Sequence, residues 1–484
     1  MALSQSENAE LKKTGIPEKS STTTLRLVTF NVNGVKTIKN YSPWNEMKDY
    51  NQMLNHMNAD IITFQELKLQ PSDVDHSLAF LDNYRSFISV PKTKKGYSGV
   101  GVFVRSPTED DDPRTQRLLN VIRAEEGISG ELNIPGLKGA LTYREAGLSD
   151  DPAIEGLSIG GYPESTLPSR EFGLQIDSEG RSVILEFDNN LVVISVYCPA
   201  NSGATEDGEL FRISFLRCLF ERARNLKALG KNVVIMGDIN ISRDVIDNDE
   251  FMRQGVRNGI LRIPAISDDD GSKFEKLNPE EVEDFKTSTD ARATLDEVLV
   301  EDTETKRKIL YDVVRKLNGR KMKMYTCWNT LKNLRPQNMG SRIDLILATS
   351  GIHKAAISAG IWPHIMGSDH CPVYADFEIK NFEPGVKDEV VKPQPHKFEA
   401  RYSFKVNQER TIASFFSAKV STESSSESST SSPNHEVQEI PISLKEQTNN
   451  LPKRRLAPPP NRGKKTKIEA SSGQRSIQSF FGRK

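Results

Sequence analysis

Cysteine is scarce in this chain: only four occur among 484 residues, at Cys198, Cys218, Cys327 and Cys371. They are widely spaced and form no Cys-x-x-Cys pair, which disfavours a zinc-binding domain or a disulfide framework and fits a reducing compartment. No apolar run approaches the roughly 18 residues of a membrane span, and the N-terminal segment lacks the apolar stretch of a secretory signal. We therefore expect a soluble, intracellular protein that does not contact a membrane.

The chain also lacks a strong excess of charge of either sign, because its formal net charge is only -1. Charge must therefore be read segment by segment rather than over the whole chain. The length suffices for one large domain or two ordinary ones.

Six short, mostly apolar segments are each followed by polar residues that can do chemistry. The segments and the residues after them are Leu25–Phe30 with Asn31, Ile61–Phe64 with Glu66, Val192–Val196 with Tyr197, Val233–Met236 with Asp238 and Asn240, Arg342–Ile343 with Asp344, and Ile365–Ser368 with Asp369 and His370. This pattern is typical of buried strands that end in functional side chains, and open sheets bind ligands at such strand ends. We therefore expect these side chains to meet at one edge of the fold.

Helical patterns alternate with the expected strands. Trp44, Met47, Tyr50, Leu54 and Met57 share one helical face, and Phe211, Phe215, Cys218, Leu219 and Leu226 share another. Residues 181–187 and 191–196 read as a hairpin around Asp188, Asn189 and Asn190. The mixture predicts α/β layers with some antiparallel pairing.

Composition predicts three parts of the chain. Residues 1–21 read as a flexible arm and residues 22–380 as the folded domain, with surface insertions at about 106–175 and 243–322. The insertions read as decoration, although a DNA-contacting role of the basic stretch 306–323 stays open. Residues 381–484 contain few large apolar side chains and read as a disordered tail.

The residues after the six segments suit the hydrolysis of a phosphate ester. Glu66 is the best ligand for a hard divalent cation, with Asn31 and Asp369 as further oxygen donors. Asp238 can orient and deprotonate a water, with Asn240 two residues later facing the same way. His370 can donate a proton to a phosphoryl oxygen while Asp344 orients its other ring nitrogen.

Two more side chains complete this set: Tyr197 and Asn201 can brace the pentacovalent phosphorus. Each signal is weak alone, because an acid after a strand is more often a loop cap and a tyrosine there is usually packing. The whole set in this order is hard to reach by chance.

Nine stretches make the chain resemble the exonuclease III family of class II AP endonucleases, in the wider endonuclease/exonuclease/phosphatase superfamily. They cover residues 30–34, 64–68, 97–101, 179–181, 196–201, 237–240, 325–328, 342–344 and 367–373. The Cys198-Pro199 pair, the two insertions and the tail motif are similar to the AP endonuclease 2 branch of that family, in a fungal form.

The resemblance implies a four-layer α/β sandwich and attack of water on a DNA phosphodiester, assisted by Mg²⁺ or alternatively Mn²⁺. It implies a base excision repair nuclease with AP endonuclease, 3′–5′ exonuclease and 3′-phosphodiesterase activities, and a monomer. The implied metal residues are Asn31, Glu66, Asp238, Asn240, Asp369 and His370. The implied catalytic residues are Tyr197, Asp238, Asn240, Asp344 and His370, and the implied phosphate or DNA contacts are Asn33, Asn201, Arg342 and His370.

Two positions depart from the family's strong abasic-site enzymes, which line the sugar pocket with bulky aromatics. Here Cys327 and Ser341 occupy those positions. A roomier pocket implies weaker AP incision and favours the activities at 3′ ends.

The tail carries a sequence that fits the binding box of the PCNA sliding clamp, with Gln474, Ile477, Phe480 and Phe481 at the specified positions. In one helical turn the last three form an apolar plug. A similar copy at residues 409–416 has Glu409 in place of the glutamine. The basic segment 453–467 reads as a nuclear-import signal or a DNA-attracting patch, so we expect a nuclear protein.

Two alternatives stay open. Another phosphoesterase of the superfamily is disfavoured by the clamp box and by the stretch from Tyr197 to Asn201. A clamp-binding scaffold with weak or no catalysis is disfavoured because the acids, amides and imidazole of the set are all present.

Overall fold

The computed structural model describes residues 15–92, 96–137, 139–264, 269–382 and 395–406. Its strands form two six-stranded sheets and one small two-stranded sheet. The first sheet has the order β13 (Ala356–Ile361), β14 (Val373–Glu378), β1 (Thr24–Asn31), β2 (Ile61–Gln65), β4 (Val100–Arg105) and β3 (Tyr84–Ser89). The second has the order β5 (Val121–Glu126), β6 (Ser182–Phe187), β7 (Leu191–Tyr197), β8 (Asn232–Asp238), β12 (Asp344–Ala348) and β9 (Tyr311–Asp312). The small sheet pairs β10 (Cys327–Trp328) with β11 (Gly340–Ser341).

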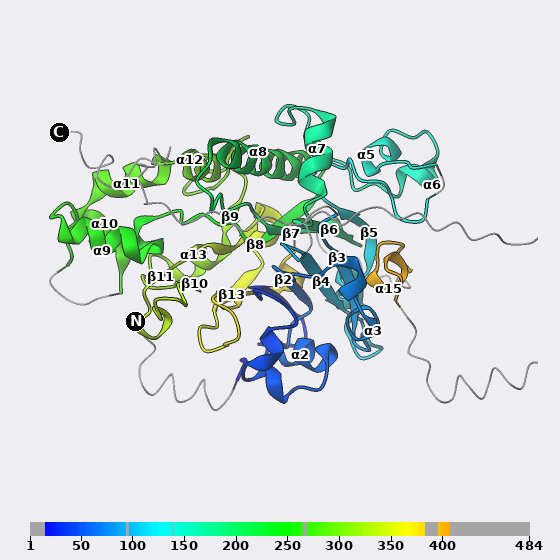
Figure 1. Ribbon diagram of the computed structural model, residues 1–484, viewed down its shortest axis with the longest axis horizontal. Coiled ribbons are helices and arrows are strands. Elements are labelled where there is room, and N and C mark those ends of the chain that lie inside the picture. The colour runs from blue at the N-terminus through cyan, green and yellow to red at the C-terminus, as the bar shows by residue number, and fades with distance from the viewer. Residues whose placement is uncertain (1–14, 93–95, 138, 265–268, 383–394, 407–484) are drawn as a thin grey trace, which may run out of the picture. The chain divides into compact units, whose positions relative to one another are not determined.

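Helices flank the sheets (Figure 1). The α-helices are α2 (Tyr50–His56), α3 (His76–Ala79), α4 (Pro113–Leu118), α5 (Tyr143–Ala146), α6 (Pro152–Glu155), α7 (Arg170–Asp177), α8 (Glu206–Ala228), α9 (Asp249–Arg257), α10 (Gly271–Leu277), α11 (Pro279–Thr287), α12 (Asp290–Asp296), α13 (Val313–Asn318), α14 (Ser350–His353) and α15 (Ala400–Ser403). Short 3-10 helices are η1 (Ile38–Asn40), η2 (Trp44–Glu46), η3 (Pro71–Asp73), η4 (Val245–Asp247), η5 (Arg335–Gln337) and η6 (Ile379–Asn381). None of the helices in these described ranges is long and apolar enough to cross a membrane.

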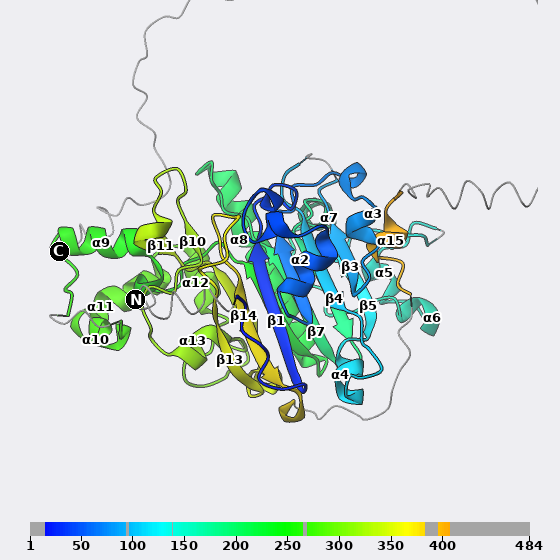
Figure 2. The same cartoon turned by 90° about the horizontal axis from the view of Figure 1, so that it is seen from below.

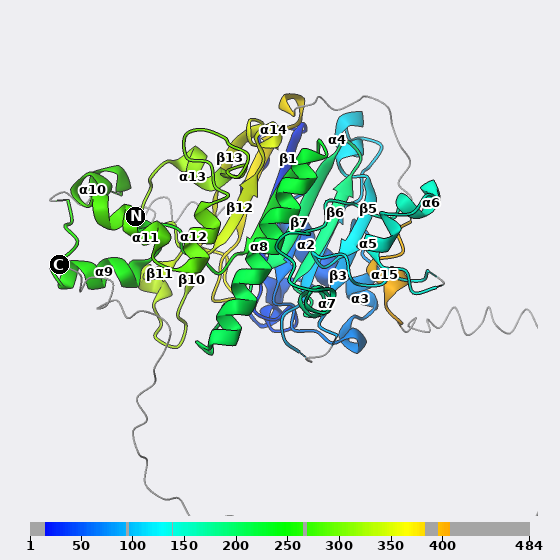
Figure 3. The same cartoon turned by 90° about the horizontal axis from the view of Figure 1, so that it is seen from above.

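The two large sheets pack face to face. Because successive residues of a strand point to opposite faces, each strand contributes side chains both to the core between the sheets and to the outer layer of helices. In β8, Val234 and Met236 join the core between the sheets, whereas Val233 and Ile235 pack under α8. The outer face of the first sheet packs against α2 and the segments around it. Figure 2 shows α2 in front of the first sheet, and Figure 3 shows α8 across the second. The described domain is therefore the expected four-layer α/β sandwich.

The hairpin and the long helix of the sequence analysis are confirmed. Strands β6 and β7 pair antiparallel around Asn189 and Asn190, which both take positive φ angles. Helix α8 is capped by Thr205, whose side chain accepts a hydrogen bond from the Gly208 N–H. The helix expected over Trp44–Met57 is instead divided into η2 and α2, because Asp49 caps a new start at Tyr50.

The two expected insertions are partly integral to the sandwich. Residues 121–126 form β5, the edge strand beside β6, and residues 311–318 form β9 and α13, whose Val313 and Val314 join the main core. The rest of the two insertions carries elements of its own: α4 to α6 and most of α7 in the first, and η4 with α9 to α12 in the second. Helices α9 to α12 pack on a small core of their own that includes Phe251, Phe274 and Phe285.

Both expected flexible segments contain residues that pack on the domain. In the arm, Ile16 is buried and Lys19 forms an ion pair with Asp60 at 3.0 Å. In the tail, Phe398 and Glu399 are buried, and Glu399 accepts a 2.6 Å hydrogen bond from Arg85 of β3. The expectation of an unstructured tail from residue 381 is therefore wrong for residues 395–406.

Candidate active site at the joined edges of two sheets

The candidate site lies where strands of both sheets end or begin. Strands β1 and β2 run parallel in the first sheet, and β7 and β8 run parallel in the second, so their carboxyl ends lie at matching edges. These ends carry Asn31, Glu66, Tyr197 and Asp238.

Two of the six expected strand ends were assigned in the wrong direction. Asp344 is the first residue of β12, and Asp369 and His370 lie in the loop before β14. Because β12 and β14 run antiparallel to β8 and β1, their starting ends lie beside the carboxyl ends of those strands. Asp344 is directly opposite Asp238 in the ladder, so the expected convergence still occurs.

The Asn31 side chain joins the two sheets at this edge. Its Nδ2 donates hydrogen bonds of 2.9 Å to Glu66 Oε1 and of 2.9 Å to Asp238 Oδ2. Its Oδ1 accepts a hydrogen bond from the backbone N–H of Asn33 at 3.0 Å. In this orientation the amide holds the two carboxylates together, and its role as a metal ligand stays a prediction.

Glu66 is a carboxylate prepared to hold a cation. Burial alone would raise the pKa of Glu66, but the Asn31 hydrogen bond and the nearby Lys68 ammonium lower it below its usual value. Lys68 Nζ lies 3.0 Å from Glu66 Oε2 and also donates to Asn33 Oδ1. The Tyr197 phenol donates to Glu66, and burial together with that carboxylate raises the pKa of Tyr197.

Asp238 sits in a tight turn at the end of β8. The Asn240 backbone N–H donates to Asp238 Oδ1 at 2.9 Å, and Asn240 Nδ2 donates to the Cys198 carbonyl at 2.8 Å. Burial and the Asp344 carboxylate raise the pKa of Asp238 to about 7. A carboxyl group that titrates near neutral pH is well suited to act as a general base.

His370 is held by the acid opposite Asp238. Its Nδ1 lies 2.8 Å from Asp344 Oδ2, and its Nε2 lies 3.9 Å from Asp238 Oδ2. Burial would lower the pKa of His370, but the Asp344 carboxylate outweighs it and raises the pKa well above its usual value. The raised pKa favours the charged form of the imidazole, which can donate a proton toward the site.

Asn33 and Asp369 meet beside this pair, where Asn33 Nδ2 donates to Asp369 Oδ1 at 2.8 Å. Asn201 faces elsewhere: its Nδ2 donates to Glu209 Oε2 at 2.9 Å and its Oδ1 accepts from the Thr205 N–H at the start of α8. A phosphate contact of Asn201 therefore stays a prediction.

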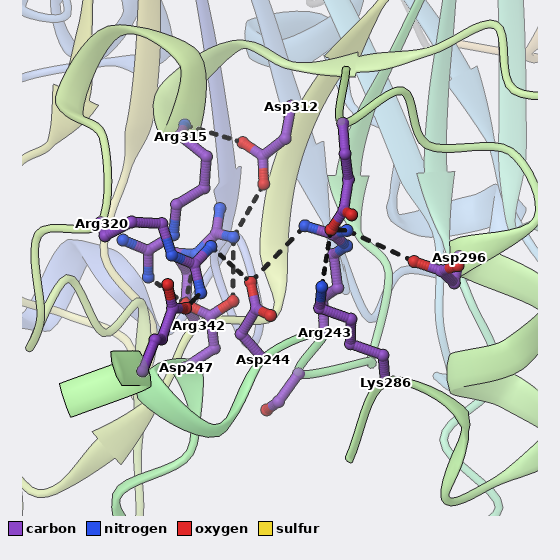
Figure 4. Close-up of polar contacts among 12 residues, drawn as sticks. Arg243, Asp244, Asp247, Lys286, Asp296, Asp312, Arg315, Arg320 and Arg342 are labelled. Atoms are coloured by element: carbon purple, nitrogen blue, oxygen red, sulfur yellow. Dashed lines mark hydrogen bonds and ion pairs between the residues drawn. The ribbon is translucent and has the colours of Figure 1, made fainter. Parts of the chain in front are cut away.

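Arg342 is not available to bind phosphate, which corrects the assignment made from the sequence. It is only 1% exposed, and its guanidinium donates two 2.9 Å hydrogen bonds to Asp247 and one of 2.7 Å to Asp312. Figure 4 shows Arg342 together with Asp247 and Asp312. Its backbone N–H also donates to the Asp247 carbonyl at 2.9 Å. Arg342 thus anchors the residues just before Asp344.

Arg342 belongs to a larger ionic cluster that also includes Asp244 and Asp247, which follow Asn240 in the chain (Figure 4). Asp247 also pairs with Arg315, and Asp244 lies 2.9 Å from Arg320 and 3.5 Å from Arg243. The cluster connects the loop after Asn240 with the segment that precedes Asp344. We infer that it keeps Asp238 and Asp344 in register.

Sequence reasoning missed two charged residues of the site. Arg181 donates to the Tyr197 carbonyl at 3.2 Å, and its guanidinium lies 5.0 Å from the centre of the Tyr197 ring. Lys68 contacts Glu66 and Asn33, as described above. Arg181 and Lys68 lie in two of the stretches that resemble the family. That resemblance could have identified them, but the sequence analysis assigned neither a role.

The residues expected to line the sugar pocket lie together. Cys327 and Ser341 are direct partners between β10 and β11, and Cys327 also forms an antiparallel bridge with His370. Both are half-buried, so small side chains adjoin the imidazole.

Comparisons with known proteins agree with this geometry. The model of the endonuclease/exonuclease/phosphatase family matches residues 28–370. The chain is 40% identical to DNA-(apurinic or apyrimidinic site) endonuclease 2 of Saccharomyces cerevisiae over 85% of this chain and 76% of that protein. It is 33% identical to the protein of the same name from Schizosaccharomyces pombe, over 73% of this chain and 58% of that protein.

A solved structure shares the fold. The crystal structure of the Xenopus laevis APE2 catalytic domain superposes with a TM-score of 0.55 at 23% identity, covering 78% of this chain and 97% of that one. At this identity the match supports the fold.

We predict that Asp247→Asn destabilises the domain strongly. The amide keeps the shape but leaves the buried Arg342 and Arg315 without their shared carboxylate, and breaking such a pair costs about 3–5 kcal/mol. Urea unfolding at pH 7 measures this, with the exposed Asp284→Asn as the control. If Asp247→Asn lowers the free energy of unfolding no more than Asp284→Asn does, Asp247 does not anchor the two arginines.

The pKa of Asp247 determines how the stability difference between the parent and Asp247→Asn depends on pH. Burial opposes ionisation of Asp247, but Arg315 and Arg342 hold its pKa below the usual value in the folded state. Its stabilisation is therefore complete above the unfolded pKa of about 4 and is lost as the pH falls toward the folded pKa. The free-energy gap between parent and Asp247→Asn should narrow on acidification below about pH 4.

Proposed function

The chain belongs to the endonuclease/exonuclease/phosphatase family, in its AP endonuclease 2 branch, and from this premise we propose that it is a Mg²⁺-dependent repair nuclease that acts mainly at DNA 3′ ends. The family assignment makes the chain a divalent-metal-dependent enzyme that hydrolyses DNA. The observation that carries the finer proposal is the group of Glu66, Asp238 and the Asp344–His370 pair, brought to one edge by Asn31.

The donor set fits Mg²⁺, which prefers oxygen ligands and uses few carboxylates. The Glu66 carboxylate is ionised and already attracts the Lys68 ammonium, and the Asp369 carboxylate lies across Asn33 from the same ammonium. We assign Glu66 and Asp369 as ligands, with Asn31 as a further candidate. When bound, the metal supplies positive charge for the phosphate oxygens and the leaving oxygen.

The chain's own residues supply the proton transfers. Asp238 orients a water and accepts its proton, since the pKa of this buried carboxyl is raised to about 7. His370, charged and oriented by Asp344, donates a proton toward a phosphoryl oxygen. Tyr197, held by Arg181, and Asn240, held against the Cys198 carbonyl, support the pentacovalent phosphorus.

The substrate preference rests on the two small residues beside His370. Cys327 and Ser341 offer little aromatic surface for stacking on a flipped abasic sugar. A frayed 3′ end needs no such stacking, so 3′–5′ exonuclease and 3′-phosphodiesterase activity should exceed AP incision.

Recruitment by the sliding clamp and a nuclear location complete the proposal. Gln474, Ile477, Phe480 and Phe481, and the basic segment 453–467, lie outside the described residues, so their support is the sequence alone. We keep the expectation that the enzyme is a monomer and acts in base excision repair.

The catalytic assignment predicts the effect of Asp238→Asn, which keeps the shape and removes the base. Removal of such a base typically lowers the rate by about 10²–10⁴. DNA binding should persist, because the lost carboxylate repels phosphate. Single-turnover cleavage of a 3′-labelled duplex in Mg²⁺ measures the rate, with the exposed Asp150→Asn as the control. A parental rate for Asp238→Asn would transfer the base role to another group.

The pocket argument predicts that the parent removes recessed or mismatched 3′ nucleotides faster than it incises an internal abasic site. Both rates are measured on matched duplexes with the same enzyme and metal. Cys327→Phe restores aromatic surface and should raise AP incision relative to 3′ removal. Faster AP incision by the parent would refute the argument.

The clamp box predicts that Phe480→Ala combined with Phe481→Ala abolishes detectable PCNA binding. Truncation of a buried aromatic hot spot commonly costs about 2 kcal/mol or more. Titration of the full chain with PCNA measures the affinity, and the matched control is Phe415→Ala with Phe416→Ala in the upstream copy. If the Phe480/Phe481 variant binds PCNA as the parent does and the Phe415/Phe416 variant does not bind, the clamp-binding site is residues 409–416.

A further inference from the structure

A second set of metal-binding atoms overlaps the active site. The Sγ of Cys327, a carboxylate oxygen of Asp369 and a ring nitrogen of His370 all lie within 4.8 Å of one another. Cys327 and Asp369 are half-buried, and His370 is buried. The hydrolytic reaction proposed above gives Cys327 no chemical role.

The backbone fixes these three residues together. Cys327 pairs antiparallel with His370, the Trp328 N–H donates to the Asp369 carbonyl at 2.9 Å, and the Cys371 N–H donates to the Thr326 carbonyl at 2.8 Å. In this pairing the His370 imidazole lies close enough to the Cys327 thiol to offset part of the rise that burial causes in the pKa of Cys327. The convergence is therefore built into the local pairing and does not depend on flexible surface side chains.

Neighbouring residues orient two of these groups as they do in metal sites. Asp344 Oδ2 lies 2.8 Å from His370 Nδ1, which leaves Nε2 as the ring nitrogen that can bind an ion. Asn33 Nδ2 donates to Asp369 Oδ1 at 2.8 Å. A carboxylate behind a ligating histidine is the common arrangement around protein-bound zinc, because it fixes the ring and its tautomer.

Ligand chemistry separates this set from the magnesium ligands. Mg²⁺ takes oxygen donors and has little affinity for sulfur, whereas a thiolate and an imidazole are preferred by Zn²⁺. Three protein ligands with an open fourth position are typical of accessible zinc sites.

We propose that Cys327, Asp369 and His370 form a Zn²⁺ site whose occupation blocks the magnesium-dependent nuclease. On binding, the Cys327 thiol loses its proton to solvent, and so does the Nε2 of His370, while Nδ1 keeps its proton on Asp344. The ion takes Asp369 from the magnesium site and removes the proton that His370 donates. Zinc occupation and phosphodiester hydrolysis are therefore mutually exclusive.

The binding arm of the test is independent of the nuclease assignment. Co²⁺ is titrated into the full-length, metal-free chain, and the thiolate-to-cobalt charge-transfer absorption is recorded, followed by displacement with Zn²⁺. We expect the band in the parent and in Cys218→Ser, because Cys218 is buried on α8 against Thr166. We expect no band in Cys327→Ser, whose hydroxyl keeps the size and loses the soft ligand.

The activity arm measures inhibition by Zn²⁺ at saturating Mg²⁺, with each rate divided by the zinc-free rate of the same variant. Loss of one ligand should raise the zinc concentration for half-inhibition by at least about 10–100-fold in Cys327→Ser, since even outer-shell changes cost that much affinity. Cys218→Ser should match the parent. The proposal is overturned if the parent shows no Cys327-dependent band, or if the parent and Cys327→Ser have the same zinc midpoint.

Discussion

The side-chain amide of Asn31 is the contact on which the site depends. One nitrogen donates to Glu66 in the first sheet and to Asp238 in the second, so a single group sets the spacing between the cation ligand and the base. Two carboxylates this close would repel each other in a buried setting, and the shared donor offsets part of that repulsion. The bridge also explains how a face-to-face sandwich, which is apolar between its sheets, can end in a polar reaction centre.

Just inside this edge, a set of buried polar side chains lies between the two sheets. The Thr29 hydroxyl donates to Gln65 Oε1 at 3.1 Å, Thr63 donates to Thr29 at 2.9 Å, and Gln65 Nε2 lies 3.4 Å from Ser195 Oγ of the second sheet. Because buried polar groups are costly unless paired, this connected set holds the two sheets at one separation. Behind the site, the cluster of Arg342 and Asp247 fixes the start of β12, so the Asp344–His370 pair is held from the other direction.

The sequence predicted the layered fold and most of the site, because short apolar segments followed by polar residues mark strand ends regardless of the pairing partner. It could not give strand direction, so Asp344 and Asp369 were placed after strands, although Asp344 begins β12 and Asp369 precedes β14. Arg342 was misassigned because a buried anchor and a phosphate ligand have the same side chain, and only the partners Asp247 and Asp312 distinguish them. Residues 395–406 were missed because their few apolar side chains, such as Phe398, gain a core only when the first sheet is present.

The most direct test of this account is the cleavage rate of Asn31→Ala in single-turnover assays at saturating Mg²⁺. Thr29→Val, two residues earlier in the same strand, is the matched control, because it removes the buried hydrogen bonds with Gln65 and Thr63 without touching Glu66 or Asp238. We predict that Asn31→Ala lowers the rate by about 10²–10³, as loss of a preorganised donor does elsewhere, while Thr29→Val stays within about tenfold of the parent. A parental rate in a folded Asn31→Ala protein would contradict the claim that this amide organises the site.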